Sequence, residues 1–289
     1  METAKIKKYK SVPDLSKQLT SNYTKDIDKV RSIFCWITQN IIYDVNEFHN
    51  DSAHKFYNYI KYKTCVGCGD SLYNAKIIDS VLRKKAAICD GYARLFKTLC
   101  MFSGIRSEMI IGMGKNDIEQ LNVYESNHAW NAVSVDNRWF LLDACWASGT
   151  CDSATMKFTP ALNEFYFFTD PRQFSYSHFP DEKKYFHYDN ALSKQTFISM
   201  PLVFDDFFLL GFDSFTPLNG LSNIKNEGKM TVTVSKLFTD KEMAFSGTGN
   251  IETKKSEIKY TLEQKLGAEK TKTLIVYYKH KAILEYKVK

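Results

Sequence analysis

The stretch Cys89-Asp90-Gly91-Tyr92-Ala93 decides how this sequence folds. The apolar residues that start there recur at three- and four-residue steps on one stripe: Tyr92, Leu95, Phe96, Leu99 and Cys100. This spacing predicts an amphipathic helix that begins at or just after Cys89, and Gly104 predicts its end. A thiol at a helix N-terminus is faced by backbone N–H groups, which favour its reactive thiolate form.

Two antiparallel strands are predicted downstream of this helix, over 129–135 and 138–142. They are preceded by a further predicted strand at Ser107–Gly112. Asp136 and Asn137 separate the two later strands and suit a two-residue hairpin turn. The middle of the chain therefore reads as helices followed by an antiparallel sheet.

A symmetric turn in this hairpin sets which residues meet beyond it. His128 then opposes Cys145, and Asp143, two residues away, projects from the same face as His128. Diagonal neighbours in a sheet lie roughly 7–8 Å apart, which side chains can bridge. An odd-length loop would send Asp143 to the opposite face, so this inference depends on the turn.

Cys89, His128 and Asp143 supply a thiol, an imidazole and a carboxylate in that order along the chain. Each one alone is more often structural: a small buried residue, a satisfied core histidine, or a turn former. Together, at a helix start and in register on a hairpin, they favour a cysteine-nucleophile triad. In it Asp143 orients the imidazole and stabilises the imidazolium.

Composition excludes several other classes of protein. The chain has 289 residues, 44% of them hydrophobic and 25% charged, which are globular values. The net charge of +6 is scattered and forms no basic stripe, so no nucleic-acid partner is expected. The most apolar stretch, Pro201–Phe212, contains Asp205 and Asp206 and is too short to span a membrane.

The chain shows no leader segment, and its seven cysteines are an odd number. These features favour the cytoplasm, while export stays open if a leader was removed. Helices are expected over 25–42 and 70–85, and an aromatic, loop-like segment over 155–199. Two domains are expected, at 1–200 and 201–289, the second a β-sandwich of immunoglobulin-like type.

Other clusters of chemically active residues carry weaker signals. Cys65 and Cys68 form a C-x-x-C pair with no second pair to complete a zinc site, so both are taken as loop thiols. His49 and His54 suit a surface loop. His178 and the nearby His187 lack an orienting aspartate at strand spacing. No metal and no cofactor are expected.

Three motifs together resemble the transglutaminase-like superfamily: Cys89–Ala93, His128–Asn131 and Leu142–Trp146. Trp36–Asp44 is similar to the entry helix of that family. The resemblance implies an α+β fold with a papain-related core, in which helices pack on an antiparallel sheet. It also implies that Cys89 is the nucleophile, His128 the general base and acid, and Asp143 the orienting carboxylate.

The segments Glu164–Pro171 and His178–Pro180 resemble the kyphoscoliosis peptidase subgroup, whose members carry a β-rich segment after the core. The chain departs from the subgroup at Tyr185–Tyr188. The resemblance covers roughly residues 25–200, and the remainder only in outline.

The expected function is that of a cysteine enzyme acting on amide bonds through a thioester. A peptidase or protein-modifying hydrolase is expected first, and a transglutaminase shares the same covalent step. The expected partner is a protein or peptide substrate. The alternative is a catalytically silent binding or scaffold module that keeps only the fold. The substrate, the acceptor and the oligomeric state are left open by the sequence.

Overall fold

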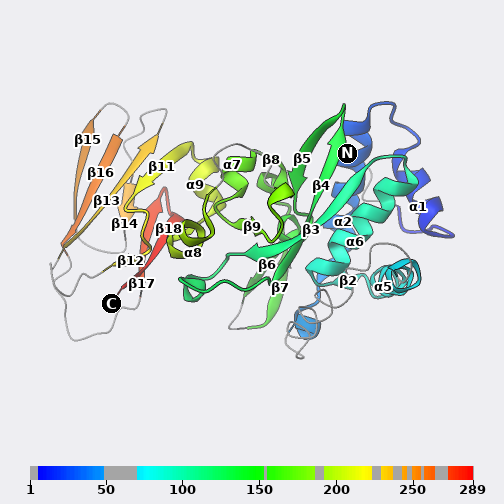
Figure 1. Cartoon of the computed structure of the whole chain (residues 1–289), viewed down its shortest axis with the longest axis horizontal. Helices are drawn as coiled ribbons and strands as arrows, with labels where there is room; N and C mark the ends of the chain where they lie inside the picture. Colours follow the sequence, from blue (N-terminus) through cyan, green and yellow to red (C-terminus); the bar gives the residue numbers. More distant parts are fainter. Residues whose placement is uncertain are drawn as a thin grey trace. The chain divides into compact units, whose positions relative to one another are not determined.

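Figure 1 shows the computed structural model of the chain, coloured along the sequence. It describes residues 6–48, 70–152, 155–185, 192–222, 229–236, 243–245, 249–254, 257–263 and 273–288. The chain forms two compact units. The first comprises Met1–Met113, Ser126–Phe174 and Pro180–Tyr188, and the second Gly114–Glu125, Ser175–Phe179 and Asp189–Lys289. The domain division near residue 200 stays a prediction.

The helices of the first unit include the three expected over 25–42, over 70–85 and from Cys89 onwards. Its helical elements are α1 (Val12–Thr20), α2 (Asp26–Asn40), α3 (Val45–Glu47), α5 (Asp70–Lys84), α6 (Cys89–Phe102), η4 (Trp146–Ser148), η5 (Glu164–Tyr166), α7 (Pro171–Phe174) and η6 (Lys183–Tyr185). α6 ends where predicted, because Gly104 has a φ of 72° and follows the last turn. Helix α1 was not predicted. No helix in the described part of the chain is long and apolar enough to cross a membrane.

The sheet of the first unit is antiparallel, with neighbouring strands in the order β8-β5-β4-β3. Its strands are β3 (Ser107–Gly114), β4 (His128–Val135), β5 (Arg138–Leu142) and β8 (Phe167–Thr169). Val135 pairs with Arg138, and the register continues to Asn131 opposite Leu142, which confirms the symmetric hairpin. Asp136 and Asn137 have φ values of 50° and 60°, the left-handed pair that a two-residue hairpin turn requires.

Helix α6 packs on β4, so the predicted helix and the predicted hairpin form adjacent layers (Figure 1). Asn131, a buried residue of β4, joins the layers. Its Nδ2 donates to the carbonyl of Ala93 in α6 at 3.1 Å and to that of Glu108 in β3 at 3.2 Å. Both carbonyls therefore have a fixed partner at the seam between helix and sheet.

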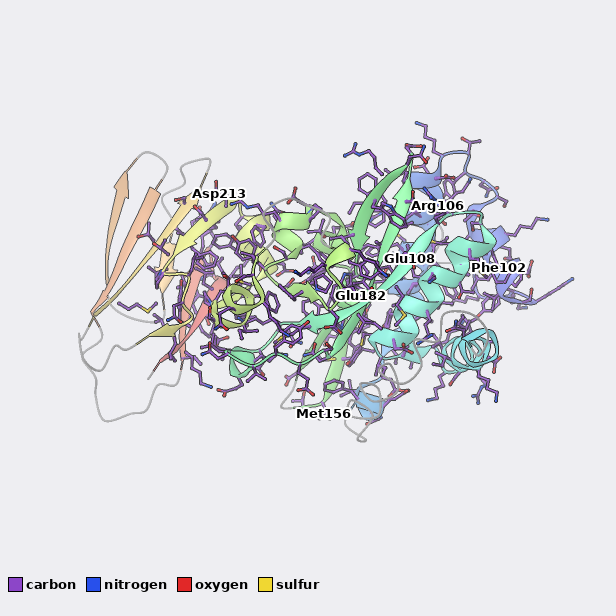
Figure 2. All side chains as sticks on the ribbon, in the orientation of Figure 1. Phe102, Arg106, Glu108, Met156, Glu182 and Asp213 are labelled. Atoms are coloured by element: carbon purple, nitrogen blue, oxygen red, sulfur yellow. The ribbon has the colours of Figure 1, made fainter. Side chains whose placement is uncertain are left out.

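Two small strand pairs lie beside this core. β1 (Ile42–Tyr43) runs parallel to β2 (Ala86–Ala87), and β6 (Gly149–Asp152) pairs with β7 (Lys157–Pro160) as a hairpin. Met156, which is labelled in Figure 2, directly precedes β7 in the sequence. The segment 155–199, expected as loop, thus contains short strands and helices, because its aromatic side chains have buried partners.

The second unit is built from two sheets, as the β-rich prediction requires. One sheet has the order β10-β18-β17-β14, with β12 paired to β18, and the other has the order β11-β13-β16-β15. The strands are β10 (Leu202–Val203), β11 (Phe212–Thr216), β12 (Leu221–Ser222), β13 (Lys229–Lys236), β14 (Met243–Phe245), β15 (Gly249–Lys254), β16 (Glu257–Glu263), β17 (Thr273–Tyr278) and β18 (Lys281–Val288). β9 (His178–Pro180) lies at the boundary between the two units.

The two sheets of the second unit share one apolar core. Its buried residues come from both sheets and include Phe212, Val232, Val276 and Tyr286. The unit is therefore a β-sandwich; its immunoglobulin-like character stays a prediction. It also holds the helical elements η3 (Ile118–Gln120), α8 (Lys194–Ser199) and α9 (Asp205–Leu209), so the expectation of an all-β pattern after residue 200 is wrong at α9.

Candidate active site

Cys89 is the first residue of α6, as predicted. The chain enters the helix from Ile88, whose φ of −89° and ψ of 176° are extended, directly after β2. The N–H groups of a first helical turn have no intrahelical acceptors and point out of the helix end. The Cys89 side chain is 6% exposed, so the thiol lies in this positive field with little bulk water around it.

Gly91 is required by close packing at the start of α6. A Cβ built at this position would lie 2.7 Å from the Cβ of Ala87 and 2.9 Å from Cγ2 of Val81. Val81 belongs to α5 and Ala87 to β2, so the first turn of α6 is pressed against both elements. The glycine of the Cys-Asp-Gly stretch therefore sets how deeply the thiol is seated.

Asp90, the residue after Cys89, carries a negative charge that acts against the thiolate form of its neighbour. Its carboxylate is buried and accepts from Nε of Arg94 at 2.8 and 2.9 Å, one helical turn later. Nη1 of Arg94 also bonds to Asn74 in α5. Burial raises the pKa of Asp90, while the charge of Arg94 and its hydrogen bonds oppose that rise. Arg94 thus compensates the carboxylate charge next to the thiol.

His128 and Asp143 meet through one short hydrogen bond. Nε2 of His128 lies 2.6 Å from Oδ2 of Asp143, and both side chains are buried. The other carboxylate oxygen, Oδ1, accepts from the backbone N–H groups of Cys145 at 2.8 Å and Trp146 at 3.1 Å. The turn after β5 therefore holds the carboxylate in place, and the carboxylate holds the imidazole.

The imidazole of His128 lies between aromatic rings. Trp130, on the same strand face, is stacked against it at a centroid distance of 6.0 Å and an interplanar angle of 25°. Trp146 approaches to 4.9 Å and is itself packed edge-on against Tyr166. These rings exclude water from the histidine and restrict its rotation. Strand alternation places Trp130, two residues from His128, on this face, whereas Trp146 comes from the turn after β5.

Cys89 and His128 are also joined. Burial acts to lower the pKa of His128, but the charge and hydrogen bond of Asp143, with a hydrogen bond and charge from Cys89, raise it from 6.5 to about 10. Because Nε2 is engaged with Asp143, Nδ1 is the ring nitrogen left for the thiol. The three residues predicted from the sequence therefore lie in one connected group.

A second buried thiol lies close to this group. Cys145 was expected on the sheet, but β5 ends at Leu142 and Cys145 sits in the turn before η4. Burial raises its pKa well above the ordinary value, and nearby Asp143 and Cys89 raise it further. Cys145 is therefore a neutral thiol. The described cysteines form no disulfide.

The remaining histidine and cysteine candidates of the sequence are His178 and five residues that the structure does not describe. Cys65, Cys68, His49, His54 and His187 lie outside the described residues. His178 belongs to the second unit, where its Nδ1 is 2.8 Å from Oγ of Ser177. Within the first unit, His128 and Asp143 are two possible metal ligands, but their ligand atoms are already hydrogen-bonded to each other, and a zinc site takes further protein ligands.

Comparison with known proteins decides the family. The model of the family described as "Transglutaminase-like domain" matches residues 10–157. The chain belongs to the transglutaminase-like superfamily. Kyphoscoliosis peptidase from Mus musculus and that from Homo sapiens are each 32% identical to it over 224 residues, 76% of this chain and 31% of each relative. This transglutaminase-like chain thus spans about a third of the length of those relatives, and it falls in their subgroup.

Two further likenesses are more distant. Hillarin from Drosophila melanogaster is 26% identical over 223 residues, which are 70% of this chain and 24% of hillarin. A solved structure of a TGase has 17% identity and a TM-score of 0.32, over 54% of this chain and 34% of that chain.

Proposed function

We propose that Cys89, His128 and Asp143 form the catalytic triad of a cysteine enzyme that acts on amide bonds. The observation that carries the proposal is the chain of contacts from carboxylate to imidazole to thiol, with the thiol at the start of α6. The raised pKa of His128 supports a protonated imidazole beside the Cys89 sulfur, and an imidazolium stabilises a neighbouring thiolate when the thiol ionises.

In the first half-reaction the Cys89 thiolate attacks the carbonyl carbon of the amide. A carbon–sulfur bond forms, and the carbonyl electron pair moves to the oxygen. When the tetrahedral intermediate collapses, the carbon–nitrogen bond breaks and the leaving nitrogen takes the proton from His128. The products of this step are a thioester at Cys89 and an amine.

In the second half-reaction His128 acts as base. The thioester has removed the thiolate, which is one of the groups that raise the pKa of His128, so the neutral imidazole can accept a proton from water. Attack of the resulting hydroxide releases a carboxylic acid and restores the thiolate. An incoming amine in place of water gives a new amide, which is the transglutaminase outcome.

We propose a peptidase or protein-modifying hydrolase first, because two relatives that are each 32% identical to this chain are named peptidases. Transfer to an amine uses the same thioester, and the partner is a protein or peptide in both cases.

The test is the rate of iodoacetamide alkylation at Cys89, followed by peptide mapping from pH 5 to 9. We expect Cys89 of the wild type to react about tenfold faster near neutral pH than Cys89 of His128→Ala, since the base that holds its proton is gone. Cys151→Ala removes an exposed thiol and serves as the matched control. Equal rates in wild type and His128→Ala would reject the triad and leave a silent scaffold module.

An electrophilic peptide probe then separates enzyme from scaffold. A peptide probe that acylates the nucleophile should add its acyl mass to the proteolytic fragment that contains Cys89. The variant Cys89→Ala should show no such added mass. Addition of an amine should shorten the lifetime of the adduct if transfer occurs. An adduct mapped to another cysteine contradicts the assignment of the nucleophile.

A further inference from the structure

Tyr43 is held beside the nucleophile by the backbone. It pairs with Ala87 in the parallel β1–β2 ladder, and the N–H of the next residue, Asp44, donates to the carbonyl of Ala87 at 2.9 Å. Ala87 precedes Cys89 by two residues. The tyrosine ring also contacts Phe158 of β7, with centroids 6.5 Å apart. Tyr43 is therefore fixed from two sides at the entrance to α6.

The hydroxyl of Tyr43 is close to the thiols of the site. The side chain is half-buried, and burial, followed by the charges of Cys145 and Cys89, raises its pKa far above the ordinary value. The phenol is therefore protonated at neutral pH. A neutral phenol is a hydrogen-bond donor.

This donor has no hydrogen-bond acceptor among the residues that the structure describes, unlike the neighbouring tyrosine. The hydroxyl of Tyr92 donates to the carbonyl of Ile41 at 2.6 Å and lies 3.2 Å from Oγ of Ser148. A half-buried hydroxyl that has no partner in the described fold can donate to a group that enters the site. The Tyr43 hydroxyl lies beside the thiols of the site and has an unused hydrogen-bond donor in the described fold, so we expect a bound substrate to supply the acceptor.

We propose that the Tyr43 hydroxyl donates a hydrogen bond to the carbonyl oxygen of the substrate amide, together with the backbone N–H of Cys89. This role rests on the proposed function, and it makes Tyr43 a catalytic residue of that reaction. As the carbon–sulfur bond forms, negative charge moves to the carbonyl oxygen. Both donors stabilise that charge without transferring a proton.

Two probes of the same thiol distinguish this role from others. Iodoacetamide loses iodide from a saturated carbon and develops no oxyanion, whereas 4-nitrophenyl acetate acylates the thiolate through a tetrahedral oxyanion and releases 4-nitrophenolate. Tyr43→Phe keeps the ring and its contacts. We expect it to slow acylation at Cys89 at least about tenfold and to change alkylation less than about twofold.

Tyr92→Phe is the matched control, because it removes a hydroxyl that already has partners inside the fold; the ratio of the two rates should equal that of the wild type. A thermal melt checks that each variant is folded at the assay temperature. An unchanged rate ratio in Tyr43→Phe, or an equal slowing of both probes, overturns the proposal. A wild type in which neither probe reacts faster at Cys89 than in His128→Ala contradicts the proposed function instead.

Discussion

Asp143 reaches His128 with a 2.6 Å hydrogen bond although the two residues are not paired in the β4–β5 ladder. The last pair of that ladder is Asn131 with Leu142, so Asp143 is the first residue beyond the strand. Its N–H donates to the carbonyl of Tyr166 at 2.9 Å, which turns the chain at this point. The backbone N–H of Asp143 is therefore fixed by Tyr166, and its carboxylate is fixed by the N–H groups of Cys145 and Trp146. The orientation of the imidazole of His128 follows from this turn.

Asp143→Asn tests this relationship with little change in shape. The amide oxygen can still accept from the N–H groups of Cys145 and Trp146, so the turn is retained. Loss of the carboxylate charge should lower the pKa of His128 from about 10, because Asp143 supplies the largest of the interactions that raise it against burial. Alkylation of Cys89 at neutral pH should fall about tenfold or more. The measurement is histidine titration by NMR; a pKa that stays near 10 would show that Asp143 is not its cause.

The same pKa predicts how stability depends on pH. The folded-state pKa of His128, about 10, lies above its ordinary value of 6.5, so the folded protein binds the proton more tightly. This contribution is complete below pH 6.5 and is lost as the pH rises through about 10. The melting temperature of the wild type should therefore fall relative to Asp143→Asn between pH 7 and 10. Parallel curves for the two proteins would contradict the linkage.

Gly91→Ala should displace the start of α6. The new Cβ would lie 2.7 Å from the Cβ of Ala87, and neither element can move without loss of packing. We expect destabilisation by about 1–3 kcal/mol and slower alkylation of Cys89. Gly104→Ala is the matched control: its φ of 72° makes alanine strained, but no atom lies within 4 Å of the new Cβ. It should cost stability and leave Cys89 alkylation unchanged, as measured by urea unfolding and peptide mapping.

Asn131→Ala should loosen the contact between the helix and the sheet. The carbonyls of Ala93 and Glu108 each lose the hydrogen bond from Asn131, and a typical intramolecular hydrogen bond contributes about 0.5–1.5 kcal/mol. Because Ala93 lies one turn after Cys89, the alkylation rate should fall as well. Ser107→Ala, which removes a donor to Ala132 within the sheet alone, should reduce stability without that effect. Equal alkylation rates in both variants would show that Asn131 acts only on stability.

Much of the site could be predicted from the sequence because it depends on local signals. The turn residues Asp136 and Asn137 set the hairpin register, and the apolar stripe after Cys89 set the start of α6. Those two features bring His128 and Asp143 onto one face and turn the thiol towards them. No long-range information was needed to propose that the three residues meet.

The parts that were not predicted depend on contacts between distant segments or on very short elements. Tyr43 lies in a strand of two residues, which has no periodicity to detect, and its neighbour Ala87 is 44 positions away. Trp146 packs on His128 because β5 ends at Leu142 and the chain turns there. The alternation of apolar and polar side chains in the sequence does not show where this strand ends. The pair of Asp90 with Arg94 had a usable signal, since opposite charges four residues apart meet on a helix.

The proposed acid–base partner and the proposed nucleophile come from different layers, His128 from the sheet and Cys89 from the helix that packs on it. Their meeting therefore requires the two layers to stay in register, and a slip of an ångström or so at the seam would separate sulfur from nitrogen while every helix and strand remained intact. Reactivity of Cys89 is consequently a more sensitive gauge of damage to this protein than circular dichroism. On heating, chemistry should vanish before secondary structure does.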